Sequence, residues 1–79
     1  MAVVRLFAQA REAAGTASDL IEAPTVADLL DEAVRKWGPE FAAVLSTSKV
    51  WVNGEEVPLA THLGDKDEVA VLPPVSGGS

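Results

Sequence analysis

The most regular apolar pattern in the chain covers residues 26–37. Apolar side chains recur there at intervals of three and four residues, the period of one helix face, at Val26, Leu29, Leu30, Ala33, Val34 and Trp37. Thr25 precedes this run and is placed to cap the free amide of Asp28. After the run, Gly38 suits a left-handed cap and Pro39 cannot continue the helix. We therefore predict a helix over residues 26–37.

Shorter apolar runs before this helix predict two strands. Residues 3–8 alternate, and the side that carries Arg5 and Phe7 should face solvent because burying an unpaired guanidinium is costly. Residues 18–22 form a weaker second strand. Between them, residues 9–14 are rich in helix formers and predict one helical turn closed by Gly15. We expect the two strands to form a hairpin with a tight connection.

The second half of the chain predicts a hairpin and a final strand. Pro39 opens a short turn that carries Phe41, and residues 49–57 contain Asn53-Gly54, a dipeptide that favours a tight hairpin turn. Pro58 limits the returning strand. Residues 61–66 are expected to form a loop and residues 67–72 the last strand, which ends at two prolines.

This order of elements predicts a two-layer α+β domain. One main helix packs across one face of a mixed sheet of four or five strands, and the other face stays open. We expect the domain to span residues 1–74, with a flexible tail over residues 75–79. Alternation places Phe7, Trp51 and Leu72 on the open face, where they would form an apolar patch close to the tail.

Composition narrows the function classes. The chain has 79 residues, enough for one domain, with 6 Lys+Arg, 12 Asp+Glu, a net charge of −6 and no Cys. This charge argues against nucleic acid or an anionic membrane as partner, and no apolar run is long enough for a membrane span. With no secretory signal pattern either, we expect a cytoplasmic protein. Few side chains suit catalysis, which favours a binding module.

The remaining candidate side chains predict no metal site. His62 is the sole imidazole, and no cysteine or other nucleophile stands near it in the sequence. Asp65, Asp67 and Glu68 lack the number and spacing of calcium ligands. We interpret all four residues as parts of solvated loops and turns.

Both ends of the chain carry the motifs of a known family. Residues 73–78 (Pro-Pro-Val-Ser-Gly-Gly), residues 63–69 (Leu-Gly-Asp-Lys-Asp-Glu-Val) and residues 7–15 (Phe-Ala-Gln-Ala-Arg-Glu-Ala-Ala-Gly) resemble the MoaD family of sulfur carriers. The element order likewise resembles the ubiquitin-like β-grasp fold. The resemblance covers essentially the whole chain.

The resemblance implies a function for the tail. MoaD-like proteins are the small subunit of molybdopterin synthase in molybdenum cofactor biosynthesis. A MoeB-like adenylyltransferase uses ATP to adenylate their terminal glycine, which then becomes a thiocarboxylate and donates sulfur to the pterin precursor within a MoaE-like large subunit. For this chain the resemblance implies a reactive Gly78 preceded by Gly77, a heterotetrameric synthase and no bound cofactor. It also implies a partner-binding surface made by Phe7, Trp51, Leu72, Pro73, Pro74 and Val75.

Two positions depart from the family. Ser79 follows the glycine that should be the reactive end, so we expect its removal to be required. Lys66 stands where the family usually has glycine, which implies either a strained turn or a turn of different construction. Three alternatives stay open: a carrier for thiazole or cysteine synthesis, a ubiquitin-like modifier attached through Gly78, and a non-covalent binding domain.

Overall fold

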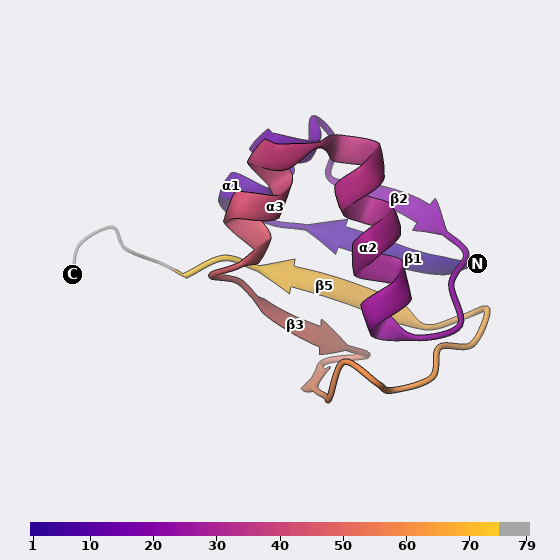
Figure 1. Cartoon of the computed structure of the whole chain (residues 1–79). Coiled ribbons are helices and arrows are strands. Elements are labelled where there is room, and N and C mark those ends of the chain that lie inside the picture. Colours follow the sequence, from indigo (N-terminus) through magenta and orange to yellow (C-terminus); the bar gives the residue numbers. More distant parts are fainter. Residues whose placement is uncertain (75–79) are drawn as a thin grey trace.

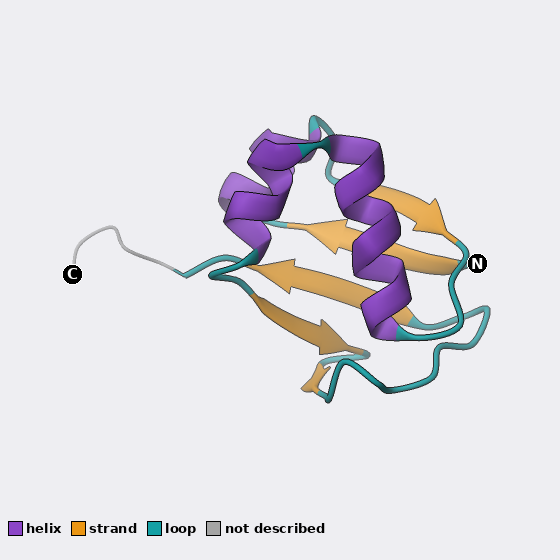
Figure 2. Ribbon diagram, in the orientation of Figure 1, coloured by secondary structure: helices purple, strands orange, loops and turns teal. Residues whose placement is uncertain are grey.

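A computed structural model describes residues 1–74. It contains five strands in one sheet, with the helices on one side of it (Figures 1 and 2). In chain order the elements are β1 (Ala2–Leu6), α1 (Ala8–Ala14), β2 (Ser18–Ile21), α2 (Val26–Trp37), α3 (Pro39–Leu45), β3 (Lys49–Val52), β4 (Glu55–Glu56) and β5 (Glu68–Leu72). The predicted α+β architecture is confirmed.

The sheet is mixed, with strand order β2-β1-β5-β3-β4. The first and last strands are its centre and run parallel, with Val4 opposite Val69. All other pairs are antiparallel. Helix α2 lies across one face, whereas α1 and α3 lie at the end of the sheet where β5 finishes (Figure 1). Within residues 1–74, no helix covers the opposite face of the sheet.

The core lies between this sheet and α2. Its residues come from every layer, and those with the lowest exposure are Phe41, Leu29, Val4, Val26, Val69 and Val71. Phe41 enters from α3 and meets the ring of Trp37 edge to face, with ring centroids 5.0 Å apart. Both aromatic residues therefore belong to the helix-covered side, as their spacing predicts.

Helix α2 has the predicted bounds and the predicted cap. The Thr25 hydroxyl accepts a hydrogen bond from the Asp28 amide at 3.2 Å. Two earlier amides, those of Val26 and Ala27, donate to the carbonyls of Thr61 and Leu59 at 3.0 and 2.9 Å. The loop after β4 therefore satisfies orphan donors of the helix, and the helix in turn fixes that loop.

Three turns show where local prediction succeeds and where it fails. Asn53 and Gly54 adopt positive φ angles of 52° and 85°, which confirms the tight hairpin. Gly38 has φ 89° but ψ −171°, so its cap is not the predicted left-handed one. Lys66 is not among the positive-φ residues of the described chain, so the expected strain of a left-handed residue is absent there.

The first connection also differs from the prediction. β1 and β2 pair antiparallel as expected, but they are joined through a seven-residue helix, so the expected tight hairpin connection is wrong. The strand ends at Leu6 instead of residue 8 because Ala8 adopts φ 51° and begins α1. Gly15, with φ 76°, closes this helix as predicted.

Candidate functional site

The carboxyl end of the chain leaves from the centre of the sheet. β5 ends at Leu72, and two prolines follow it. Pro74 is exposed, whereas Pro73 is buried and borders a hollow of about 270 Å³ with Val44 and Thr47. The partner contacts predicted for Pro73 and Pro74 stay predictions, with Pro74 the more accessible of the two in the free chain. Val75, Gly77, Gly78 and Ser79 lie outside the described residues.

The open face of the sheet has an apolar end next to this exit. Phe7 is 44% exposed and Trp51 37% exposed, both on the predicted side, and Leu72 is half-buried. The register sets Trp51 opposite Ala70 on β5, and Leu72 one step further along the same strand. These three residues, which we term the apolar patch, thus lie around the end of β5.

A charged pair interrupts the open face beyond the apolar patch. Arg5 Nε donates to Glu68 Oε2 at 2.5 Å, and both side chains are about half exposed. Arg5 stands opposite Ala70 in the parallel pair, and Glu68 opposite Val3. An exposed pair of this kind adds little stability, about 0–1 kcal/mol, so its main effect is to place fixed charge in the middle of the face.

The acidic residues before β5 build a turn. The Asp67 carboxylate accepts hydrogen bonds from the Gly64 amide at 2.8 Å and from the Asn53 side-chain amide at 3.0 Å. These two bonds hold the pKa of Asp67 below its usual value. The Asn53 oxygen in turn accepts from the Glu68 amide at 3.0 Å. Residues 1–74 contain no cluster of acidic or histidine ligands that could hold a metal ion.

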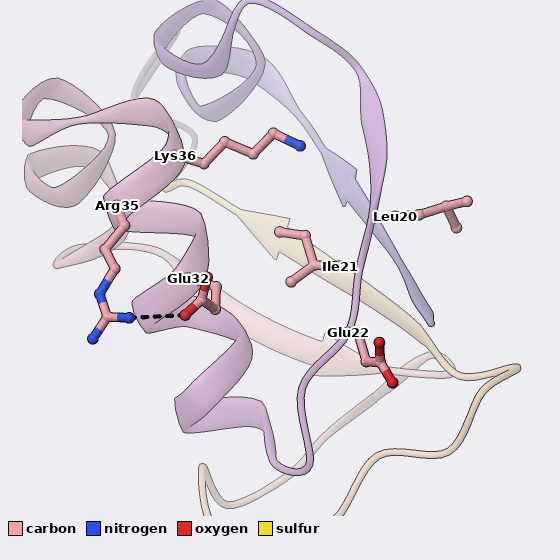
Figure 3. A pocket seen from close by; sticks show the side chains of 6 residues that line it. All are labelled: Leu20, Ile21, Glu22, Glu32, Arg35 and Lys36. Carbon is pink, nitrogen blue, oxygen red and sulfur yellow. Dashed lines mark hydrogen bonds and ion pairs between the residues drawn. The ribbon is translucent and has the colours of Figure 1, made fainter.

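A shallow hollow of about 410 Å³ lies on the other side, between β2 and α2 (Figure 3). Two cations border it, but both are paired. Arg35 Nη1 donates to Glu32 Oε1 at 2.9 Å, and Lys36 forms an ion pair with Asp19. The Asp19 carboxylate accepts hydrogen bonds from Lys36 and from the Leu20 amide, and both lower its pKa, the bond from Lys36 by more. With both cations neutralised, the hollow offers no charge for an anionic ligand.

None of the helices in residues 1–74 has the length and hydrophobicity needed to cross a lipid bilayer.

Comparisons with known proteins extend over almost the whole chain. The ThiS family matches residues 4–78. The molybdopterin synthase sulfur carrier subunit of Arabidopsis thaliana is 36% identical over 78 residues, covering 95% of this chain and 80% of that protein.

Solved structures agree with this match. The small archaeal modifier protein 1 (SAMP1) of Methanosarcina acetivorans superposes with a TM-score of 0.87 at 33% identity, covering 98% of this chain and 95% of that chain. A putative molybdopterin converting factor, subunit 1, from Pyrococcus furiosus superposes with a TM-score of 0.83 at 30% identity, covering 94% and 97%.

Proposed function

This chain belongs to the ThiS family, and we propose on that premise that it is the sulfur carrier subunit of a molybdopterin synthase. The coarser statement, a sulfur carrier of the MoaD/ThiS superfamily, follows from the match over residues 4–78. The finer one rests mainly on the Arabidopsis thaliana relative, which is 36% identical to this chain over 78 residues and whose name gives that role.

The reactive group in this proposal is a main-chain carboxylate. A carboxylate is a poor acceptor until its oxygen attacks the α-phosphorus of ATP and pyrophosphate leaves. A sulfur nucleophile then displaces AMP from the acyl adenylate, and the thiocarboxylate that remains is a soft nucleophile. Gly77 and Gly78 suit this work because residues without Cβ can thread a narrow channel in a partner. The adenylating enzyme binds the ATP, and the carrier needs no cofactor of its own.

The apolar patch supports the docking part of the proposal. A carrier must present its tail to an activating enzyme and then to a synthase subunit, and both need a surface beside the tail to recognise. Phe7 and Trp51 leave aromatic surface uncovered near the end of β5, and the third member of the patch, Leu72, stands three residues before Val75. Aromatic anchors contribute much of the binding energy at interfaces. We assign this patch to a MoeB-like adenylyltransferase and a MoaE-like large subunit, the latter in a heterotetrameric synthase.

A second candidate is a ubiquitin-like protein modifier. The similarity to the small archaeal modifier protein 1 favours it, since that structure superposes as well as the sulfur carriers do. In this alternative the same activated Gly78 is transferred to a lysine amine of a target protein, and an isopeptide bond replaces the thiocarboxylate.

Mass spectrometry separates the two candidates. The full chain and a chain ending at Gly78 are incubated with the adenylyltransferase, ATP and a sulfide donor. Sulfur transfer predicts that the shorter chain gains the mass difference between one sulfur and one oxygen, whereas the full chain, blocked by Ser79, does not. Glycine remnants on lysines of other proteins, without that mass gain, would instead support the modifier. Equal reaction of both chains would refute the need to remove Ser79.

A further inference from the structure

Lys49 is a cation beside the point where the chain leaves the sheet. It is the first residue of β3 and stands opposite Leu72, the last residue of β5; the start of β3 lies beside the end of β5 in Figure 1. Residues opposite each other in an antiparallel pair project their side chains to the same face. Lys49 is exposed, so its side chain lies on the open face, as does that of Trp51 two residues later. The ammonium group therefore borders the apolar patch on its β3 side.

The chain itself does not neutralise this ammonium. Arg5, Arg35 and Lys36 each form an ion pair with a carboxylate of the chain. Within residues 1–74, no carboxylate lies within ion-pair distance of Lys49. The sequence has 12 Asp+Glu against 6 Lys+Arg, so the missing partner does not reflect a shortage of acidic residues. A free positive charge beside the tail is therefore a local feature of an otherwise acidic protein.

The charges around Trp51 give the apolar patch a direction. Glu56 on β4 is exposed and stands opposite Trp51, so it shares the open face. Trp51 is thus bordered by the cation of Lys49 toward the tail and by the anion of Glu56 on the outer strand. In the middle of the face, Arg5 and Glu68 neutralise each other. A partner that covers the patch therefore meets the positive charge on the tail side.

We propose that the adenylyltransferase presents a carboxylate to Lys49 where it covers the apolar patch, and that this ion pair orients the chain with its tail toward the active site of the enzyme. The inference rests on the proposed function and specifies the chemistry of that partner. An enzyme that covers Leu72 and Trp51 also removes water from the ammonium beside them. An ammonium without water or a counter-charge is costly, whereas one matched by a carboxylate fixes the register of the interface and excludes wrong partners.

A second copy of the chain is the competing occupant of this face. Lys49 of one copy and Glu56 of another have opposite charges and could pair across two apolar patches. Each copy carries a net charge of −6, however, and two such chains repel each other at low salt. We therefore assign the face to the adenylyltransferase and treat self-association as an outcome of the test.

The test is calorimetric titration of the adenylyltransferase with the full chain and its variants. ATP is left out, so that contact between Lys49 and its phosphates cannot contribute. Lys49→Gln should weaken binding about two- to fivefold at low salt, as the loss of a surface ion pair does, and added salt should reduce the difference. Lys49→Arg keeps the charge and should bind within about twofold of the parent chain. Lys49→Glu brings two carboxylates together and should weaken binding about tenfold or more.

Two controls separate the local ion pair from the net charge. Lys66→Glu makes the same change in net charge at an exposed lysine before β5, at the opposite end of that strand from Leu72. It should have far less effect than Lys49→Glu. The exchange of Lys49→Glu with Glu56→Lys keeps the net charge at −6 and should still weaken binding. Urea unfolding of each variant verifies that the fold is kept.

A carbodiimide cross-link identifies the carboxylate. The reagent activates a carboxylate, the Lys49 Nζ attacks its carbon, and an amide bond forms with net loss of water. Mass spectrometry should find Lys49 joined to an Asp or Glu of the adenylyltransferase, and changing that residue to Lys should restore binding of the Lys49→Glu chain.

Several results would overturn the proposal. They are unchanged affinity of a folded Lys49→Gln chain, equal weakening by Lys49→Glu and Lys66→Glu, and a complex in which Lys49 is cross-linked to a second copy or to no carboxylate of the enzyme. All of these leave the proposed function standing. Absence of binding by the parent chain would instead refute the proposed function together with this inference.

Discussion

Replacing Phe7 with alanine should weaken binding to the adenylyltransferase far more than it weakens the fold. A phenylalanine offers about 200 Å² of surface, of which 44% is exposed in the free chain, so about 90 Å² is left for a partner to cover. At about 25 cal/mol per Å², that area corresponds to about 2 kcal/mol, or about a thirtyfold rise in the dissociation constant.

The fold should survive this substitution. Phe7 lies between β1 and α1, outside the buried core, and its covered part contributes at most about 3 kcal/mol of the about 4–12 kcal/mol expected for a chain of this length. The measurement is calorimetric titration with the adenylyltransferase, alongside urea unfolding of each variant. Leu20→Ala is the control, because it removes a similarly exposed side chain far from the end of β5. Unchanged affinity in a folded Phe7→Ala chain would refute the docking role of the apolar patch.

Three further predictions concern stability. Phe41→Ala, at a fully buried ring, should cost about 3–5 kcal/mol in urea unfolding, and a cost below 1 kcal/mol would contradict its place in the core. Thr25→Ala removes the cap of α2 and should cost about 1 kcal/mol, whereas Thr25→Ser, which keeps the hydroxyl, should cost much less. Asp67→Asn should lower stability at pH 7. Because the folded pKa of Asp67 lies below its ordinary value of 3.8, its contribution is present above that pH and is lost as the pH falls through the folded pKa. The difference between Asp67→Asn and the parent chain, measured in urea at pH 7 and pH 3, should therefore shrink in acid, and a constant difference would argue against the carboxylate.

Features specified by neighbouring residues were predictable from the sequence. The bounds of α2 follow from its apolar period, from Thr25 and from the Gly38-Pro39 stop, all within a single segment. The hairpin follows from Asn53-Gly54 in the same way. Alternation alone placed Phe7 and Trp51 on the open face, because a strand with one buried face leaves only one choice for each side chain.

Features that depend on distant partners were not predictable. The burial of Pro73 depends on α3, which lies some thirty residues earlier in the chain. The hydrogen bond of Asp67 with Asn53 joins residues 14 apart in the sequence, and no local pattern announces it. Thr16 and Asp19 bond backbone groups of β2 only one or two residues away. That these bonds lie on an edge strand follows from the sheet order, which is set by strands distant in the sequence.

Because β1 pairs with β5, the sheet can form only when the segments of both strands are present. Val3 stands opposite Glu68, so the centre of the sheet cannot form until nearly the whole chain has been synthesised. A fragment that stops before Glu68 lacks Val69 and Val71 in the core and leaves β1 and β3 without their common neighbour. Such a fragment lacks the assembled apolar patch, so under our proposal it would not bind an activating enzyme in place of the complete carrier. In this fold the apolar patch and the carboxyl end to which we assign the sulfur chemistry are therefore acquired together.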